Sequence, residues 1–492
     1  MPSEAQTRRV QAPHACNMTP SEATVKTRLQ IEQDTYSLVI TRRNASEVLC
    51  LADGPYCALP SVEISHSERV AEQTNAVVYR QFNVEAYCLS THFPDLLHSA
   101  LRVCGYCAME CLEPEAAVPS QLYWVSASSL SEATFRNSVT LTDVQRILRT
   151  ITPAGPSEDA ATFGKSGSLR KITNWVQNQV ESLNLRLTGR FRQLSASPTF
   201  CLLRFETNGP ALWFKAVGEP NIREFTITST LAELFPDFLP RLIAVRHRWS
   251  AWLMTEPEGV APDTTCEWPV WKTVVDRLAK LQIASAPHTS ELLLAGARDV
   301  TARSLLERVD EFLLVMQAIM TQQRKTPPSI MTAKEVIALA HPLKDALSIL
   351  TEGLVPDALN HLDCNPGNIL VSTDRCVFFD WAEAAVGFPF LTFEYLREHF
   401  GRSCPIIAHR AAELAGHYAD HWRPHIAAGA LSKCLAVSPL VAVFAYAVLN
   451  DIWRDPTHLA NPSTAGYFRA LTRRISREAH VLEGRSPQCF RQ

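Results

Sequence analysis

Four polar residues in the C-terminal half of the chain have the types and the spacing for metal-assisted chemistry. They are His361, Asp363, Asn368 and Asp380, in the segments HLDCNPGNILV and VFFDW. Amide and carboxylate oxygens, such as those of Asn368 and Asp380, are ligands that Mg²⁺ takes from proteins, with waters completing its shell. Asp363 is a further carboxylate that can accept the proton of a substrate hydroxyl. The pattern predicts a magnesium site beside a general base.

Two short apolar runs are expected to position these side chains. Residues 369–371 and 377–379 read as strands, and the turn-forming residues between them favour an antiparallel hairpin. Asn368 precedes the first strand and Asp380 follows the second, so both should lie at the same end of the hairpin. A base, an amide ligand five residues later and a second carboxylate after a hairpin is the layout of phosphoryl-transfer sites in kinases.

An apolar strand expected at residues 212–217 carries a single lysine, Lys215. A buried lysine is costly unless it is paired or reaches a phosphate, and kinases provide both conditions. Glu224, nine residues later, is the expected partner, and Glu233 is the alternative. Met254 lies where the backbone of a kinase hinge would contact adenine.

The segments HLDCNPGNILV and FFDWAEAAVGFPF resemble those of the aminoglycoside phosphotransferase and choline kinase-like family. The resemblance covers residues 169–483. It implies an α+β fold with a two-lobed protein kinase-like domain, in which the N-lobe is β-rich and the C-lobe is helical. It also implies Mg²⁺ as cofactor, ATP as phosphate donor with GTP as the alternative, and a small-molecule hydroxyl as acceptor.

The same resemblance assigns roles to individual residues. It implies that Asp363 is the catalytic base and that His361 shapes its loop. Asn368 and Asp380 would be the metal ligands. The nucleotide would be bound by the residues introduced above, Lys215, Glu224 and Met254.

Three positions depart from the family pattern: Leu362 replaces a glycine, Phe388 interrupts a Gly-Asp-Pro pattern, and Thr392 stands at the second acidic position. No GxGxxG motif occurs, so residues 194–199 would have to cover the phosphates. These departures leave a second function open, a pseudokinase or binding module that holds nucleotide without transferring phosphate. We expect an enzyme, because every residue that contacts phosphate or metal in the family pattern is present.

The helical region after Asp380 is expected to select the acceptor. From residue 391 onward it contains eight acidic residues against twelve lysines and arginines, together with several aromatic residues. An enzyme for polycationic aminoglycosides would need an excess of carboxylates there. We therefore expect a neutral or weakly charged hydroxylated metabolite, such as an intermediate of specialised metabolism.

Changes in sequence texture divide the chain into five parts. We expect a flexible arm at residues 1–33, a β-rich accessory domain at 34–150, a linker at 151–168, the N-lobe at 169–256 and the C-lobe at 257–485.

The accessory domain should contain strands near residues 36–41, 47–51, 84–89, 102–111 and 123–125, and a helix near 67–79. This order loosely resembles a Nudix-like fold. The helix offers only Glu68 and Glu72 on one face and lacks the Glu-rich box of that family. We expect a non-catalytic accessory domain, with an active Nudix hydrolase as the alternative.

Composition excludes several function classes. The chain has 492 residues and a net charge of −3, from 47 Lys+Arg and 50 Asp+Glu, without the basic excess of nucleic-acid binders. The longest apolar run, residues 437–449, is shorter than a membrane span, and residues 1–18 lack the apolar core of a secretory signal. We expect a cytoplasmic protein with reduced cysteines and with neither nucleic-acid nor membrane partners. The oligomeric state stays open.

Two further clusters have metal-compatible spacing. Cys104, Cys107 and Cys111 cluster in RVCGYCAMEC with a CxxC spacing, but a structural zinc site needs four ligands and His98 is the only obvious nearby candidate for the fourth. His417 and His421 are one helical turn apart, but the sequence places no carboxylate or third histidine with them. An apolar cysteine-rich strand and a helix surface are the preferred interpretations.

Overall fold

The computed structural model describes residues 33–489, except residues 66–68, 93–104, 116, 132–133, 136–137, 154–162, 353–354 and 374. Strands predominate up to Thr255 and helices after it, which confirms the expected α+β class. The described residues form two compact units. The sheet unit contains the chain up to Phe225 together with Arg241–Glu256. The helical unit contains Thr226–Pro240 and the chain from Pro257 onward.

The first sheet of the sheet unit is mixed. Its strands are β1 (Gln33–Arg42), β2 (Glu47–Asp53), β3 (Tyr56–Ala58), β4 (Ser61–Ser65), β5 (Ala86–His92), β6 (Gly105–Cys111) and β7 (Leu122–Ser126). The order is β3-β2-β1-β6-β5, with β4 paired to β1 and β7 paired to β2, and β1 runs parallel to β6. Helix α1 (Val70–Phe82) contacts β4 and β5, and helix α2 (Ser138–Ile151) was not expected.

The Nudix-like interpretation of this first sheet stays a prediction. Glu68 lies outside the described residues. Glu72 forms an ion pair with Arg192, so its carboxylate has a structural partner.

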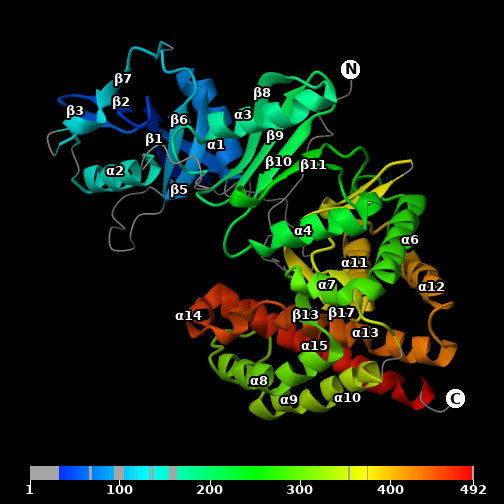
Figure 1. Ribbon diagram of the computed structural model, residues 1–492. Coiled ribbons are helices and arrows are strands. Elements are labelled where there is room, and N and C mark those ends of the chain that lie inside the picture. The colour runs from blue at the N-terminus through cyan, green and yellow to red at the C-terminus, as the bar shows by residue number, and fades with distance from the viewer. Residues whose placement is uncertain are drawn as a thin grey trace. The chain divides into compact units, whose positions relative to one another are not determined.

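The second sheet, drawn in green in Figure 1, has five strands, and Lys215 lies on the middle strand. Its strands are β8 (Leu187–Ala196), β9 (Cys201–Thr207), β10 (Leu212–Ala216), β11 (Leu242–Arg246) and β12 (Ala251–Thr255), in the order β11-β12-β10-β9-β8. All neighbouring strands are antiparallel. Helix α3 (Ser168–Val180) precedes the sheet, and helix α4 (Arg223–Leu234) follows β10.

The two sheets share one hydrophobic core. It contains Val39 and Tyr87 of the first sheet together with Leu203 and Phe214 of the second. Gln193 of β8 also joins the sheets, since its side-chain amide donates to the Cys88 carbonyl at 2.7 Å and accepts from the Cys88 N–H at 2.9 Å. A separate accessory domain was expected; its boundaries at residues 150 and 168 stay predictions.

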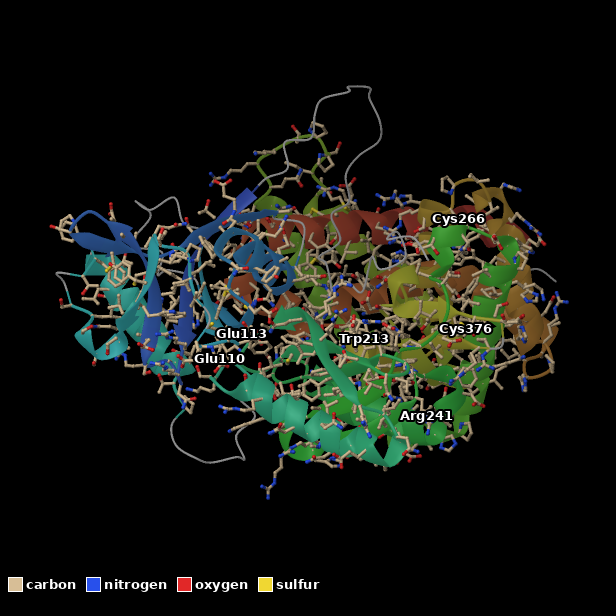
Figure 2. The ribbon with its side chains drawn as sticks, turned by 90° about the horizontal axis from the view of Figure 1, so that it is seen from above. Glu110, Glu113, Trp213, Arg241, Cys266 and Cys376 are labelled. Carbon is tan, nitrogen blue, oxygen red and sulfur yellow. A yellow bond between two sulfur atoms is a disulfide. The ribbon has the colours of Figure 1, made fainter. Side chains whose placement is uncertain are left out.

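The end of the expected linker is packed against this unit. The ring of Phe163 is buried and lies edge-on to Phe214 and Trp249, each at 6.0 Å. The N–H of Gly167 donates to the Glu110 carboxylate at 2.9 Å; Glu110 is labelled in Figure 2. These contacts fix residues 163–168 as part of the folded unit.

The helical unit consists mainly of helices. They are α5 (Pro262–Thr265), α6 (Trp268–Ser285), α7 (Thr289–Leu294), α8 (Ala302–Thr321), α9 (Ala333–Ala338), α10 (Ala340–Thr351), α11 (Phe390–Ser403), α12 (Ala411–Trp422), α13 (Ala428–Val448), α14 (Pro456–Leu459) and α15 (Pro462–Cys489). A small sheet, β13-β17-β14, is formed by β13 (Arg298–Val300), β14 (Ala358–His361) and β17 (Ala384–Gly387). A hairpin pairs β15 (Ile369–Val371) with β16 (Cys376–Phe378).

Helix α13 corrects the expectation drawn from the apolar runs. The expected apolar run began at residue 437 and contained Pro439, but the helix continues on both sides of this proline. The whole helix is long and apolar enough to cross a bilayer by length and composition. Its most apolar window is 61% buried within the protein. A core helix of a globular protein passes the same test, so this helix is weak evidence for a membrane span.

We expected all cysteines to be free thiols, but one pair of the described cysteines forms a disulfide. Cys266, labelled in Figure 2, forms a disulfide with Cys404. The pair is 138 residues apart, so sequence spacing could not reveal it. The zinc interpretation of the other cluster is untested, because Cys104 and His98 lie outside the described residues. Cys107 is buried in β6 beside the Cys88 thiol.

Candidate active site

The hairpin of β15 and β16 brings the two expected metal ligands to one end. Ile369 pairs with Phe378, and β16 begins and ends one residue earlier than expected. The N–H of Phe379 donates to the Asn368 carbonyl at 3.1 Å. Asn368 therefore lies opposite the residue that precedes Asp380, as the antiparallel arrangement predicted.

Asp363 is held on its loop by the amides of two asparagines. The Asn368 side-chain N–H donates to Asp363 Oδ2 at 3.1 Å and to its carbonyl at 2.9 Å. The Asn365 side-chain N–H donates to Asp363 Oδ1 at 3.1 Å, while Asn365 Oδ1 accepts from the Gly367 N–H at 2.9 Å. The side-chain oxygen of Asn368 accepts no hydrogen bond from any described residue, so it is available to another ligand, such as a cation.

Burial is the largest influence on the charge of Asp363, and it raises the pKa of this carboxyl above its ordinary value. The negative charge of Asp380 raises the pKa further. His361, the Asn365 amide and the Tyr395 hydroxyl act in the opposite direction, without reversing the shift. A raised pKa brings a carboxylate closer to the range in which general bases are effective.

His361 is fully buried at the end of β14 and acts on the loop through its backbone and ring. Its Nε2 donates to the Phe379 carbonyl at 3.0 Å, and its ring packs 4.4 Å from the Trp381 ring. Burial lowers the pKa of His361, so the neutral imidazole is favoured. Nδ1 has no hydrogen-bond partner among the described residues. These contacts tie the loop of Asp363 to the residue before Asp380.

Tyr395 is a residue that the sequence analysis missed. It lies on α11, and its hydroxyl donates to Asp363 Oδ1 at 3.2 Å. The Tyr395 ring lies 4.8 Å from the ring of His399 and 5.7 Å from the ring of Tyr446. The sequence marked it only as one of several aromatic residues in the substrate region. Thirty-two residues separate it from Asp363, and no local pattern joins the two.

Thr392, one of the departures from the family pattern, supports the catalytic loop. Its hydroxyl accepts from the His361 N–H at 2.9 Å and donates to Asn360 Oδ1 at 2.8 Å. The Asn360 side-chain N–H in turn donates to the carbonyls of Gly387 and Phe388, both at 3.2 Å. A neutral hydroxyl therefore connects α11, β14 and β17.

Leu362 and Phe388, the other two departures, are buried apolar side chains of the helical unit's core. Phe388 lies 4.8 Å from Phe390. Both side chains pack in the core, and the hydrogen bonds of Asp363 to Asn365, Asn368 and Tyr395 are present beside them.

In the sheet unit, Lys215 forms a buried ion pair with Glu224. Lys215 lies on β10 and is 8% exposed, while Glu224 opens α4 and is 2% exposed. The Lys215 ammonium also lies 5.8 Å from the Trp252 ring. Glu233 is exposed on α4, so the structure selects Glu224 of the two candidate partners.

The contacts of Met254 and of residues 194–199 neither support nor contradict their expected roles in nucleotide binding. Met254 lies inside β12, between β10 and β11, where backbone groups take part in the sheet. Its contact with adenine stays a prediction. The turn after β8 uses its own groups, because the N–H groups of Thr199 and Phe200 donate to the Ser197 hydroxyl at 3.3 and 2.9 Å.

The residues around Asp380 fit a hard divalent cation such as Mg²⁺. Asn368 and Asp380 supply only oxygen ligands, which Mg²⁺ prefers. Asp380 has a left-handed backbone with φ of 67°, a conformation that is costly for residues other than glycine and is concentrated at functional sites. The Asp380 charge also raises the pKa of Asp363, and a bound cation would offset this repulsion.

A comparison with protein families covers this part of the chain. Residues 270–403 match the phosphotransferase enzyme family. The match contains Asp363, Asn368 and Asp380, and it confirms the resemblance inferred from their motifs. It covers a little over a quarter of the 492 residues and does not include Lys215. No curated protein matches the chain.

Several solved phosphotransferase structures are similar to the chain. Choline kinase from Streptococcus pneumoniae is 12% identical, with a TM-score of 0.41, and the match covers 63% of this chain and 99% of that protein. Choline kinase from Cryptosporidium parvum is 10% identical, with a TM-score of 0.44, over 65% of this chain and 98% of that protein. A spectinomycin phosphotransferase solved with ADP and spectinomycin is 11% identical, with a TM-score of 0.39, over 63% of this chain and 98% of that protein.

Proposed function

We propose that the protein is a Mg²⁺-dependent phosphotransferase that transfers a phosphoryl group from ATP to a hydroxyl of a small-molecule metabolite. The observation that carries the proposal is the hydrogen-bonded carboxylate of Asp363, beside Asn368, in the segment that matches the phosphotransferase family. GTP is the alternative donor. A cytoplasmic location remains our prediction.

Asp363 would orient the acceptor hydroxyl and accept its proton as the oxygen attacks the terminal phosphorus. The bond from that phosphorus to the bridging oxygen breaks, and a nucleoside diphosphate leaves. Asn368, Asn365 and Tyr395 hold the carboxylate through three hydrogen bonds. Such positioning supplies most of the acceleration in phosphoryl transfer.

Asn368 and Asp380 would hold the metal through oxygen atoms. When bound, Mg²⁺ neutralises charge on the phosphate oxygens. His361 would hold the loop of Asp363 close to Asp380, because its ring donates a hydrogen bond to the carbonyl of Phe379, the residue before Asp380.

Lys215 would bind phosphate oxygens of the nucleotide, and Glu224 would keep the ammonium in place. A lysine that is 8% exposed on an apolar strand needs such a counter-charge. The ion pair supports the same role that these residues have in the family pattern.

The departures from the family pattern do not favour a binding module. Thr392 retains a hydrogen bond to the loop backbone, and Leu362 and Phe388 pack in the core. The pseudokinase therefore has no specific observation in its favour among the described residues.

For the acceptor, we propose a neutral or weakly charged hydroxylated metabolite, such as an intermediate of specialised metabolism. Six of the eight acidic residues after residue 391 form ion pairs with arginine or histidine, which leaves little free negative charge for a polycation: Glu394, Glu398, Glu413, Asp420, Asp451 and Asp455. The aromatic residues support this proposal less than expected. Phe390, Phe393, Phe444 and Trp453 are core residues, whereas Tyr395, Tyr446 and Tyr467 are partly exposed.

The experiment is an acceptor screen with ATP and Mg²⁺, read out by nucleoside diphosphate release and by the mass of the phosphorylated acceptor. We expect transfer to a neutral polyol or aromatic alcohol by the wild-type protein and by Asp420→Asn, a control at an exposed aspartate. Asp380→Asn should bind nucleotide more weakly and transfer nothing measurable. Nucleotide binding without transfer to any acceptor would support the binding module. Efficient transfer to kanamycin-type substrates, at about 10⁴ M⁻¹s⁻¹ or more, would refute the acceptor class.

A further inference from the structure

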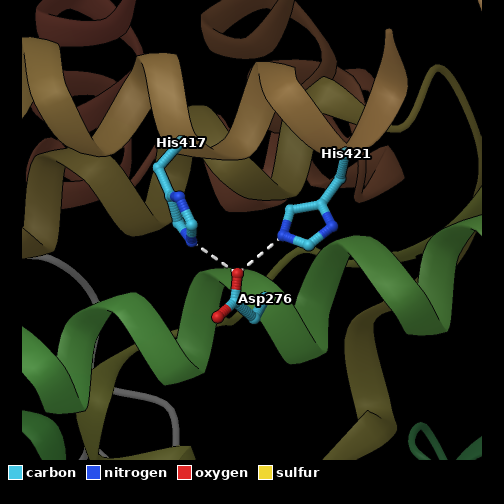
Figure 3. A group of neighbouring side chains, drawn as sticks. All are labelled: Asp276, His417 and His421. Carbon is cyan, nitrogen blue, oxygen red and sulfur yellow. Dashed lines mark hydrogen bonds and ion pairs between the residues drawn. The ribbon is translucent and has the colours of Figure 1, made fainter. Parts of the chain in front are cut away.

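Three metal-ligating side chains meet between α6 and α12 of the helical unit, apart from the residues assigned to phosphoryl transfer. Asp276 lies on α6, and His417 and His421 lie on α12 (Figure 3). His417 Nε2 is 2.5 Å from Asp276 Oδ1, and His421 Nε2 is 2.6 Å from the same oxygen. The histidine spacing is visible in the sequence, but the carboxylate comes from a helix about 140 residues earlier, so the helix-surface interpretation was incomplete.

We propose that Asp276, His417 and His421 form a binding site for a transition-metal dication, with Zn²⁺ as the best-fitting ion. Two imidazole nitrogens and one carboxylate oxygen are a donor set that zinc uses, with a water as fourth ligand when three protein ligands are present. Imidazole ligands do not suit Mg²⁺, which prefers oxygen. The site would thus be chemically distinct from the one at Asn368 and Asp380.

The helix geometry supports this donor set. Residues four apart lie on one helix face, so His417 and His421 both point from α12 towards Asp276 on the facing helix (Figure 3). Leu414, one turn before His417, and Trp422, next to His421, are both fully buried and anchor α12. Packing of these two residues fixes the backbone of the helix, so both imidazoles stay directed towards Asp276.

The three side chains have room to accept an ion. They are 22–26% exposed, so one side of the cluster is open to water. A tetrahedral zinc with bonds of about 2.0–2.1 Å requires ligand atoms roughly 3.3 Å apart. Present separations are hydrogen-bond lengths, and small rotations of these partly exposed side chains would provide the difference. Each imidazole would bind the ion through Nε2 and keep one proton, on Nδ1, with any second proton released to solvent.

The surrounding charges favour an ionised Asp276. Burial raises the pKa of this carboxyl, but the hydrogen bonds from His421 and His417, with the charges of His417 and Lys272, together outweigh burial and lower it overall. Lys272 lies 3.7 Å from the other carboxylate oxygen. Glu413, one turn before His417, is paired with Arg410. A dication would therefore bind to an ionised Asp276, and Lys272 is the cationic side chain that already contacts this carboxylate.

A metal here would join two helices that support the catalytic region. Gln282, also on α6, donates to the Pro389 carbonyl at 2.6 Å, just before α11. Tyr418 of α12 donates to Gln282 at 2.6 Å and stacks on Phe393 of α11 at 4.2 Å. The proposed role is structural, a clamp on the α6–α12 contact. It does not depend on the acceptor or on phosphoryl transfer.

The test is a zinc titration of the full-length protein after removal of metals by chelation, with Mg²⁺ in excess so that oxygen sites are filled. We expect one equivalent of Zn²⁺ to bind and to raise the melting temperature. The His417→Ala/His421→Ala double variant should lose that equivalent and the thermal shift. His425→Ala is the matched control, because His425 is exposed and lies four residues after His421.

A second measurement distinguishes this site from the cysteines and uses only the wild-type protein. Co²⁺ bound to the wild-type protein should give the absorption bands of a four- or five-coordinate nitrogen–oxygen site, without a thiolate charge-transfer band. A thiolate band at the first equivalent would overturn the proposal. Equal zinc binding by the folded double variant, or no zinc binding by the wild type, would also overturn it.

Discussion

The hydroxyl of Tyr395 should set the pH at which Asp363 becomes an effective base. The variant Tyr395→Phe removes only the oxygen that donates to Asp363 Oδ1 at 3.2 Å. This hydrogen bond stabilises the ionised carboxylate and therefore lowers the pKa of Asp363. Its loss should raise the pKa further above the ordinary value, because burial and the charge of Asp380 then act with less opposition.

The size of the shift follows from the hydrogen bond. Hydrogen bonds to charged groups contribute about 1.5–3 kcal/mol, and one pKa unit corresponds to about 1.4 kcal/mol. A separation of 3.2 Å is long for a hydroxyl–carboxylate bond, so we expect a contribution just below that range, about 0.7–1.4 kcal/mol, which corresponds to about 0.5–1 pKa unit.

The assay is the pH dependence of kcat/KM with a fixed acceptor and saturating Mg²⁺. Asp363 must be unprotonated to act, so the acidic limb of the profile should move to higher pH by about 0.5–1 unit in Tyr395→Phe. Below the limb the variant should be up to about tenfold slower, and well above it the two proteins should converge. Tyr79→Phe, at an exposed tyrosine, should leave the profile unchanged. An unmoved limb, or one displaced to lower pH, would refute the role of this hydroxyl.

Three further predictions concern the elements that hold the site. Glu224→Gln should destabilise the protein by about 3–5 kcal/mol in urea unfolding, because Lys215 stays buried without its counter-charge; a loss below about 1 kcal/mol would contradict the buried pair. Thr392→Ala should lower the free energy of unfolding by about 1–3 kcal/mol and lower kcat, whereas Thr392→Ser should behave like wild type. Equal unfolding free energies and kcat values for the two variants would exclude a role for the hydroxyl. Gly387→Ala should destabilise the protein, since a Cβ would lie 2.3 Å from a β13 carbonyl oxygen. Gly401→Ala should stabilise it by up to about 1 kcal/mol, because this helical position is open. A denaturation midpoint that does not fall for the first variant and rise for the second would contradict the packing.

Local patterns allowed much of the site to be predicted. The hairpin of β15 and β16 needs only two apolar runs and a short turn, so its pairing follows from adjacent residues. Lys215 and Glu224 were also paired correctly, because only nine residues separate the strand from the start of the helix. Interactions of this kind are fixed by short-range geometry that the sequence displays directly.

Contacts made across the chain could not be predicted in this way. Tyr395 reaches Asp363 only because α11 packs beside its loop, and Asp276 meets His417 only because α6 packs on α12. Thr392 departs from the family pattern, yet its hydroxyl supports the loop by accepting from the His361 N–H across 31 residues of sequence. Such pairs depend on helix packing, which no local spacing encodes.

Helix α2 is a different case, because the sequence did contain its signal. Val144, Ile147, Leu148 and Ile151 are buried at helical spacing along one face. The segment is also rich in threonine and β-branched residues, which have low helix propensity. Burial of the apolar face outweighed that propensity, and periodicity was the better guide.

The most direct test of the central claim is a single-turnover measurement of phosphate transfer by the wild-type protein and by Asp363→Asn, with nucleotide binding measured in parallel. The amide keeps the shape of the side chain but cannot accept the proton of the acceptor hydroxyl. We predict that the variant binds ATP with Mg²⁺ nearly as tightly as the wild type and transfers phosphate about 10²–10⁴-fold more slowly. Transfer by Asp363→Asn within a few fold of the wild-type rate would contradict the assignment of Asp363 as the base.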